Sequence, residues 1–120
     1  MYSQKGVINK MKISCLREEL LNNINIVSKA VSTRTTLPIL ECILLKADSQ
    51  GLKLIANDLE IGIESAYIPS IIDSEGIIAL EAKIFSEIIR KMEGETVFIE
   101  VLENNVTIIS CGSSEFKIMG

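Results

Sequence analysis

The chain has 120 residues, a formal net charge of −4 at pH 7 and no histidine. This charge argues against nonspecific nucleic-acid binding by bulk charge, and the lack of histidine removes the commonest general base, the usual catalytic triad and the usual metal ligand set. Because 48% of the residues are hydrophobic but only 4% are aromatic, the core must be aliphatic, which favours sheet with some helix in a single domain.

The first predicted helix follows a short strand near the start of the chain. Residues 1–10 show no clear period, and we expect a leader or an upstream extension there, so the predicted domain covers residues 11–120. Residues 16–31 predict a helix with Ser14 as its N-cap. Its apolar residues recur at spacings of three and four, which predicts one buried stripe of Leu16, Leu20, Ile24, Val27 and Val31.

Three strands are predicted after this helix. Pro38 fixes its own φ and disfavours the α region for Leu37, so the helix must end before this point. Strands are then predicted at 40–47, 52–56 and 61–68, with turns at 48–51 and at Asn57-Asp58. Pro69 closes the third strand.

The same order of elements then returns. Residues 76–81 predict a strand, residues 82–92 a helix, and residues 96–102, 106–110 and 115–119 three strands, with a hairpin turn at Asn104-Asn105. The predicted fold class is α+β: a duplicated β-α-β-β-β unit with two helices on one side and antiparallel sheets on the other. Such packing places the polar faces of both helices on one surface.

Five cations are expected on that helical surface. They are Lys29, Arg34, Lys83, Arg90 and Lys91. One interpretation is an ordinary solvated helix face, and the other is a phosphate-facing patch in an otherwise acidic protein. Glu18, Glu19 and Glu87 dilute the positive charge, so tight sequence-specific binding is not expected.

Two other features leave alternatives open. Asp58 and Glu60 lie two residues apart, and they form either a metal or acid–base pair or, more simply, a turn aspartate and a strand-edge glutamate. Phe116 and Ile118 share one face of the last strand, with Glu115 and Lys117 on the other. That strand is either an exposed edge through which a small interaction module dimerises or an ordinary part of the core.

The cysteines and the hydropathy pattern indicate where the protein resides. Cys15, Cys42 and Cys111 are widely spaced and odd in number, which is typical of buried thiols in a reducing compartment rather than of a metal site. No apolar run approaches the roughly 20 residues of a transmembrane helix. We therefore expect a cytoplasmic protein without a metal or another cofactor.

Several blocks of sequence occur in one order along the chain. They are Met11-Lys12-Ile13, Arg17-Glu18-Glu19-Leu20-Leu21, Thr36-Leu37-Pro38-Ile39-Leu40, Asn57-Asp58-Leu59-Glu60-Ile61, Ala82-Lys83-Ile84-Phe85 and Gly112-Ser113-Ser114-Glu115-Phe116. This order resembles the first domain of the bacterial DNA polymerase III β subunit family, the sliding clamps. The resemblance covers residues 11–120, and the Thr-Leu-Pro-Ile-Leu block is its most specific part.

The resemblance implies a processivity factor rather than an enzyme. Clamps of this family have three similar domains per chain and close head to tail as homodimers into a ring around double-stranded DNA, which they contact without regard to sequence. Polymerase activity resides in partner subunits. DNA polymerase III and the clamp loader bind a cleft between the second and third domains, so we expect residues 11–120 to lack that cleft.

The resemblance also implies roles for particular residues. Arg34 matches an arginine that faces DNA in relatives, and Lys83 and Arg90 match basic positions on the second lining helix. Phe116 and Ile118 match apolar positions on the strand that meets the partner subunit, and Ile84 is placed with them in the expected dimer interface. Because Ile84, Ser113 and Glu115 stand where some relatives have basic residues, interface ion pairs known elsewhere are not expected here.

Overall fold

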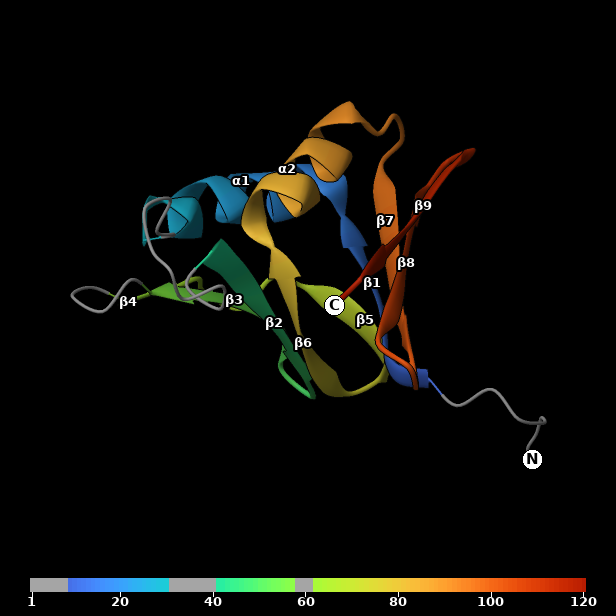
Figure 1. Ribbon diagram of the computed structural model, residues 1–120, viewed down its shortest axis with the longest axis horizontal. Helices are drawn as coiled ribbons and strands as arrows, with labels where there is room; N and C mark the ends of the chain where they lie inside the picture. Colours follow the sequence, from blue (N-terminus) through green and yellow to red (C-terminus); the bar gives the residue numbers. More distant parts are fainter. Residues whose placement is uncertain (1–8, 31–40, 58–61) are drawn as a thin grey trace.

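The fold has two antiparallel sheets with two helices packed on one side of them (Figure 1). The computed structural model describes residues 9–30, 41–57 and 62–120. The elements are, in order, β1 (Asn9–Leu16), α1 (Arg17–Val27), the 3₁₀ helix η1 (Ser28–Ala30), β2 (Cys42–Asp48), β3 (Gly51–Asn57), β4 (Gly62–Glu64), β5 (Ser70–Ser74), β6 (Gly76–Glu81), α2 (Ala82–Lys91), β7 (Thr96–Leu102), β8 (Val106–Cys111) and β9 (Ser114–Met119).

The two halves of the chain exchange strands. Sheet A has the order β5-β1-β7-β8-β9, and sheet B has the order β4-β3-β2-β6. The first strand of each half therefore pairs with the sheet of the other half: β1 lies beside β7, and β6 lies beside β2. The predicted α+β class, with two helices and antiparallel sheets, is confirmed. The second half has the predicted strand–helix–three-strand order, and the first half has the same order with one added strand, β5. The strand exchange joins both halves around one core.

Two strands differ from the prediction: β4 is shorter than the strand predicted at 61–68, and β5 was not predicted. β4 ends at Glu64 because the hydroxyl of the next residue, Ser65, replaces a backbone carbonyl in the pairing with β3. Ser65 Oγ accepts the Leu54 N–H at 2.9 Å. The pairing resumes only as a bridge between Leu52 and Ile68. After Pro69 the chain crosses to sheet A and forms β5 beside β1.

The start of α1 also differs from the prediction. β1 begins at Asn9, so Asn9 and Lys10 belong to the strand and not to a leader outside the fold. The predicted N-cap Ser14 lies within β1, and the N-cap is Leu16, which makes no side-chain capping bond. Since Met11, Ile13 and Cys15 point into the core, strand alternation turns Leu16 outward, and it is 50% exposed rather than part of the helix stripe.

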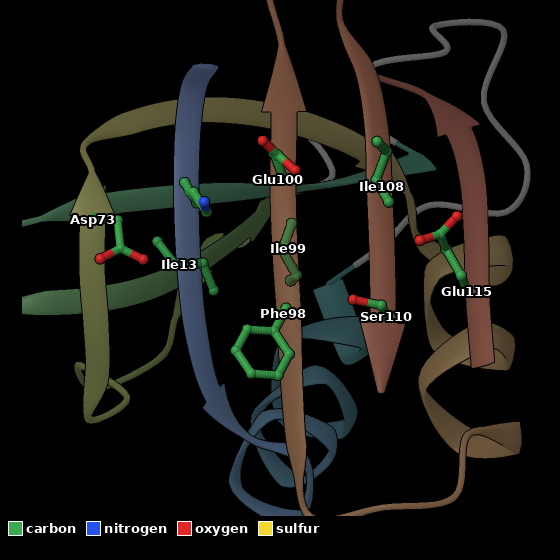
Figure 2. Close-up of a pocket in the computed structure, with 9 residues that line it drawn as sticks. Ile13, Asp73, Phe98, Ile99, Glu100, Ile108, Ser110 and Glu115 are labelled. Carbon is green, nitrogen blue, oxygen red and sulfur yellow. The ribbon is translucent and has the colours of Figure 1, made fainter. Parts of the chain in front are cut away.

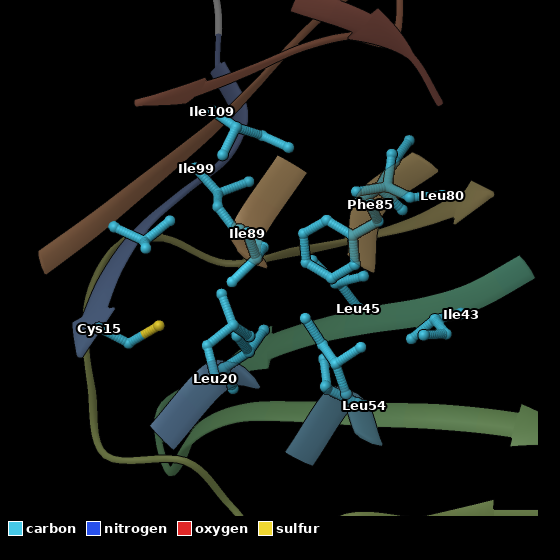
Figure 3. Packing of buried hydrophobic residues seen from close by; sticks show 14 of the residues in the cluster. Cys15, Leu20, Ile43, Leu45, Leu54, Leu80, Phe85, Ile89, Ile99 and Ile109 are labelled. Carbon is cyan, nitrogen blue, oxygen red and sulfur yellow. The ribbon is translucent and has the colours of Figure 1, made fainter. Parts of the chain in front are cut away.

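The core lies between the helices and the inner faces of both sheets (Figure 3). Leu20, Ile24 and Val27 of α1 are fully buried as predicted, whereas Val31 lies outside the described residues. From α2, Phe85 and Ile89 are fully buried, and Phe85 lies close to Leu45 and Leu80 of sheet B. The helices are thereby fixed on the sheets by their apolar faces, which leaves their polar faces on the surface.

Candidate nucleic-acid interface

The exposed cations of α2 arise from the amphipathic pattern of that helix. Ala82, Phe85, Ile88 and Ile89 are buried, so the helix presents its opposite side to solvent. Lys83 and Arg90 are seven residues apart, almost two turns, and therefore lie on the same side. Lys83, Arg90 and Lys91 are all exposed. We call these three residues the α2 cations.

None of the α2 cations forms an ion pair with a carboxylate within the described part of the chain, although Glu87 lies one turn from Lys83 and from Lys91 on the same helix. The ion pair formed there joins Lys53 and Glu64, with Nζ and Oε1 3.3 Å apart. Arg90 instead donates from Nη2 to Ser86 Oγ at 3.1 Å, a neutral partner one turn earlier. A cation without a carboxylate partner keeps its charge available to an anion in solution, and a phosphate is such an anion.

The structure does not group the other two predicted DNA-facing residues, Lys29 and Arg34, with the α2 cations. Lys29 is exposed in η1, which follows the C-terminal end of α1, and the α2 cations lie on the other helix. Arg34 lies outside the described residues, as do Asp58 and Glu60. Elsewhere in the chain, within the ranges that the structure describes, no group of three or more potential metal ligands is found.

Two of the predicted interface residues, Phe116 and Ile118, lie on an edge strand. β9 is the last strand of sheet A, and among the described residues it pairs with β8 alone. Phe116 and Ile118 lie opposite the buried residues Ile109 and Thr107, so their side chains share one face of β9, as predicted, and this is the inner face of the sheet. Phe116 is nevertheless 39% exposed, because the core does not extend fully under this edge, and Ile84 on α2 is 43% exposed.

The outer face of sheet A carries a shallow pocket of about 150 Å³ (Figure 2). Three carboxylates line this pocket together with the half-exposed ring of Phe98: Asp73, Glu100 and Glu115. Lys12 pairs in register with Glu100 on the neighbouring strand, and Lys117 of β9 shares this face. Charges of both signs alternate across these strands, which is typical of a solvated sheet face.

One cation of the sheets, Lys53, is held by both a carboxylate and an aromatic ring. Lys53 bonds Glu64 and lies 4.5 Å from the centroid of the Tyr67 ring. Tyr67 in turn donates its hydroxyl to Asp48 at 3.0 Å. The backbone N–H of Gln50 lowers the pKa of Asp48, and the Tyr67 hydroxyl lowers it further. This cluster stabilises the turn between β2 and β3.

The thiols offer no reactive nucleophile. Burial, together with a smaller contribution from the charge of Glu19, raises the pKa of Cys15 to about 12. Cys111 is buried as expected, whereas Cys42 is only half-buried. Burial also raises the pKa of Cys42, with smaller contributions from Glu81 and Glu41. Near neutral pH, Cys15 and Cys42 therefore remain thiols rather than thiolates.

Arg17 is a residue whose importance the sequence analysis missed. Its Nε donates to the carbonyl of Ile89 at 2.8 Å and its Nη2 to that of Arg90 at 2.7 Å, so the side chain joins the start of α1 to the end of α2. One signal in the sequence could have indicated this role. Arg17 is the first residue of α1, where the helix dipole disfavours a cation, so another contact must compensate.

A family model of the DNA polymerase III beta subunit, N-terminal domain, matches residues 11–120. The chain belongs to this family. The resemblance inferred from the ordered sequence blocks is thereby confirmed.

Individual relatives agree with this assignment. A beta sliding clamp from Halalkalibacterium halodurans is 41% identical over 112 residues, which are 87% of this chain and 29% of the relative. The clamp of Bacillus subtilis is 39% identical over 118 residues, 92% of this chain and 31% of the relative. The chain thus spans about a third of the length of these clamps.

The fold comparison gives the same result. A crystal structure assigned as a DNA polymerase III beta subunit from Eubacterium rectale superposes with a TM-score of 0.88 at 53% identity, covering 92% of this chain and 30% of the other. The sliding clamp of Bacillus subtilis gives a TM-score of 0.85 at 36% identity, covering 90% and 30%. Two helices backed by antiparallel sheets are therefore the fold of the clamp family as well as of this chain.

Proposed function

We propose that this chain supplies the first domain of a DNA sliding clamp, the processivity factor of the replicative DNA polymerase III. In the full-length protein this domain forms part of a ring dimer that encircles double-stranded DNA. The observation that carries the proposal is the set of α2 cations, which are exposed and have no carboxylate partner in the described part of the chain. Membership of the clamp family supports the same function.

The proposed mechanism needs weak contacts rather than tight ones. A clamp held on DNA by its ring shape must slide, so its contacts should go to phosphates, which carry no sequence information directly. Lys83, Arg90 and Lys91, with Lys29 and Arg34, supply such contacts. On this proposal the chain is non-catalytic and acts in the cytoplasm, where DNA polymerase III and the clamp loader bind the full-length clamp.

Neither helix of the described part is long and apolar enough to cross a membrane.

The proposal predicts binding that is sensitive to salt and blind to sequence. Two fluorescent 20-base-pair duplexes of unrelated sequence should bind the chain with affinities within about twofold of each other in anisotropy titrations at low salt. Affinity should fall steeply as salt is raised, because each neutralised phosphate contributes about 0.9 to the slope of log K against log salt. Binding that is unaffected by salt, or that strongly prefers one duplex, would contradict this mechanism.

A second candidate function rests on the β9 edge. An edge strand with a partly exposed apolar residue tends to pair with another chain, and Phe116 is 39% exposed on β9. On this alternative the chain is a small interaction module that dimerises through β9 and has no role on DNA.

Replacing Phe116 tests whether this edge forms a contact between chains. If it does, Phe116→Asp should abolish the concentration-dependent association of the wild-type chain in sedimentation velocity runs, since a charge would be buried in an apolar contact. Met119→Asp is the matched control, because Met119 is 67% exposed on the outer face of the same strand. An association state that is identical in wild type and Phe116→Asp would exclude this edge as the contact.

A further inference from the structure

The end of α2 is completed by a side chain from α1. α2 ends at Lys91, and the extended residue Met92 returns its N–H to the carbonyl of Ile88 at 3.2 Å. The last carbonyls of a helix have no donor within the helix. Arg17 supplies donors to two of them, Ile89 O at 2.8 Å and Arg90 O at 2.7 Å, and it places a positive charge at the negative end of the α2 dipole.

Arg17 also holds the segment that follows the helix. Its backbone N–H donates to the carbonyl of Glu95 at 2.8 Å, and the preceding residue Leu16 pairs with Thr96 at the start of β7. Arg17 therefore holds both ends of the turn between α2 and β7: its side chain bonds the end of α2, and its backbone N–H bonds Glu95 just before β7. Only the planar guanidinium fork reaches two carbonyls with a fixed geometry, which a lysine ammonium does not reproduce.

This arrangement bears directly on the α2 cations. Arg90 and Lys91 lie in the last turn of α2, and the carbonyl of Arg90 is itself an acceptor of the Arg17 bond. The Arg90 guanidinium is further held by Ser86 at 3.1 Å. A cation that is held in place before binding loses less conformational freedom when it meets a phosphate.

We propose that Arg17 is a positioning residue for DNA binding: it fixes the last turn of α2 and so holds Arg90 and Lys91 toward the phosphates. Arg17 itself does not contact DNA, because its guanidinium is engaged by two carbonyls. This inference rests on the proposed function and adds to it a residue that acts through the helix end.

Two variants separate this role from a direct charge effect. Arg17→Lys keeps the charge but loses the fork, and Arg17→Met loses both. We expect each to weaken binding of a 20-base-pair duplex at low salt by about threefold or more, because both release the last turn of α2. In both, the Met92 amide should exchange with solvent about tenfold faster than in wild type, because the helix end opens more often. Lys12→Met, on the exposed outer face of β1, is the control and should change neither quantity.

The possible outcomes are distinct. Wild-type affinity in Arg17→Lys with a loss only in Arg17→Met would assign a direct charge contact and overturn the proposal. Unchanged affinity in both, with faster Met92 exchange, would leave Arg17 a purely structural role and also overturn it. Affinities are compared at a temperature below the thermal unfolding midpoint of each variant. If Arg17→Met does not fold, Arg17→Lys alone tests the proposal. A wild-type chain that binds no duplex would instead refute the proposed function, and this inference with it.

Discussion

Removing all three α2 cations should weaken DNA binding by at least about tenfold at low salt, because up to three phosphate contacts are lost. The variant is Lys83→Ala/Arg90→Ala/Lys91→Ala. If each cation neutralises one phosphate, the slope of log K against log salt should become shallower by about 2 to 3. Anisotropy titrations of a labelled duplex at several salt concentrations measure both quantities.

The control for this experiment removes the same charge from other surfaces. Lys12, Lys46 and Lys117 are exposed on the outer faces of the two sheets, away from the helices. The variant Lys12→Ala/Lys46→Ala/Lys117→Ala has the same net charge as the helix variant. Its affinity should change by about twofold or less, since only the long-range field of the protein changes. Equal losses in both variants would show that net charge, and not the α2 surface, attracts the DNA.

The second large effect is expected in the core. Phe85→Ala should lower the free energy of unfolding by about 3 to 5 kcal/mol, the usual cost of truncating a buried phenylalanine. Phe85 is fully buried and lies where α2 meets Leu45 and Leu80 of sheet B (Figure 3). No other aromatic ring is near it in the cluster shown there, so the aliphatic side chains around it would have to fill the cavity.

Urea denaturation followed by circular dichroism measures this loss, which should appear as a lower midpoint with an unchanged slope. Ile84→Ala is the matched control, because Ile84 is the preceding residue of the same helix and is 43% exposed. It should change stability by only about 0.5 kcal/mol. A loss below about 1 kcal/mol for Phe85→Ala would mean that the helix is not held on sheet B by this ring.

Most elements of the fold could be predicted because their signals are local. The alternation of Val97, Ile99 and Val101 predicted β7 with its observed bounds, and Asn105 occupies the predicted turn with a φ of 67°. The errors occurred where a tertiary contact overrides the local pattern. β4 ends early because the Ser65 hydroxyl accepts the N–H of Leu54 on the neighbouring strand β3, and β5 forms because it pairs with the edge of β1.

One part of the candidate site could be predicted from local sequence, and another part depends on tertiary contacts. The exposure of Lys83, Arg90 and Lys91 followed from the spacing of the buried residues in α2, since a helix with one apolar stripe must present its other side to water. A cation at the first position of α1 indicates that Arg17 needs a compensating contact, but the sequence does not identify the end of α2 as its partner, because these residues lie more than seventy positions apart.

The sequence by itself determined most of the elements, their repeated order and the clamp family, because periodicity, turn residues and ordered motifs are properties of short segments. Only the tertiary structure decided which strands pair across the two halves and what holds the end of α2. Those contacts depend on how distant segments pack around a shared core, and pairing between distant strands leaves no periodic trace in the sequence.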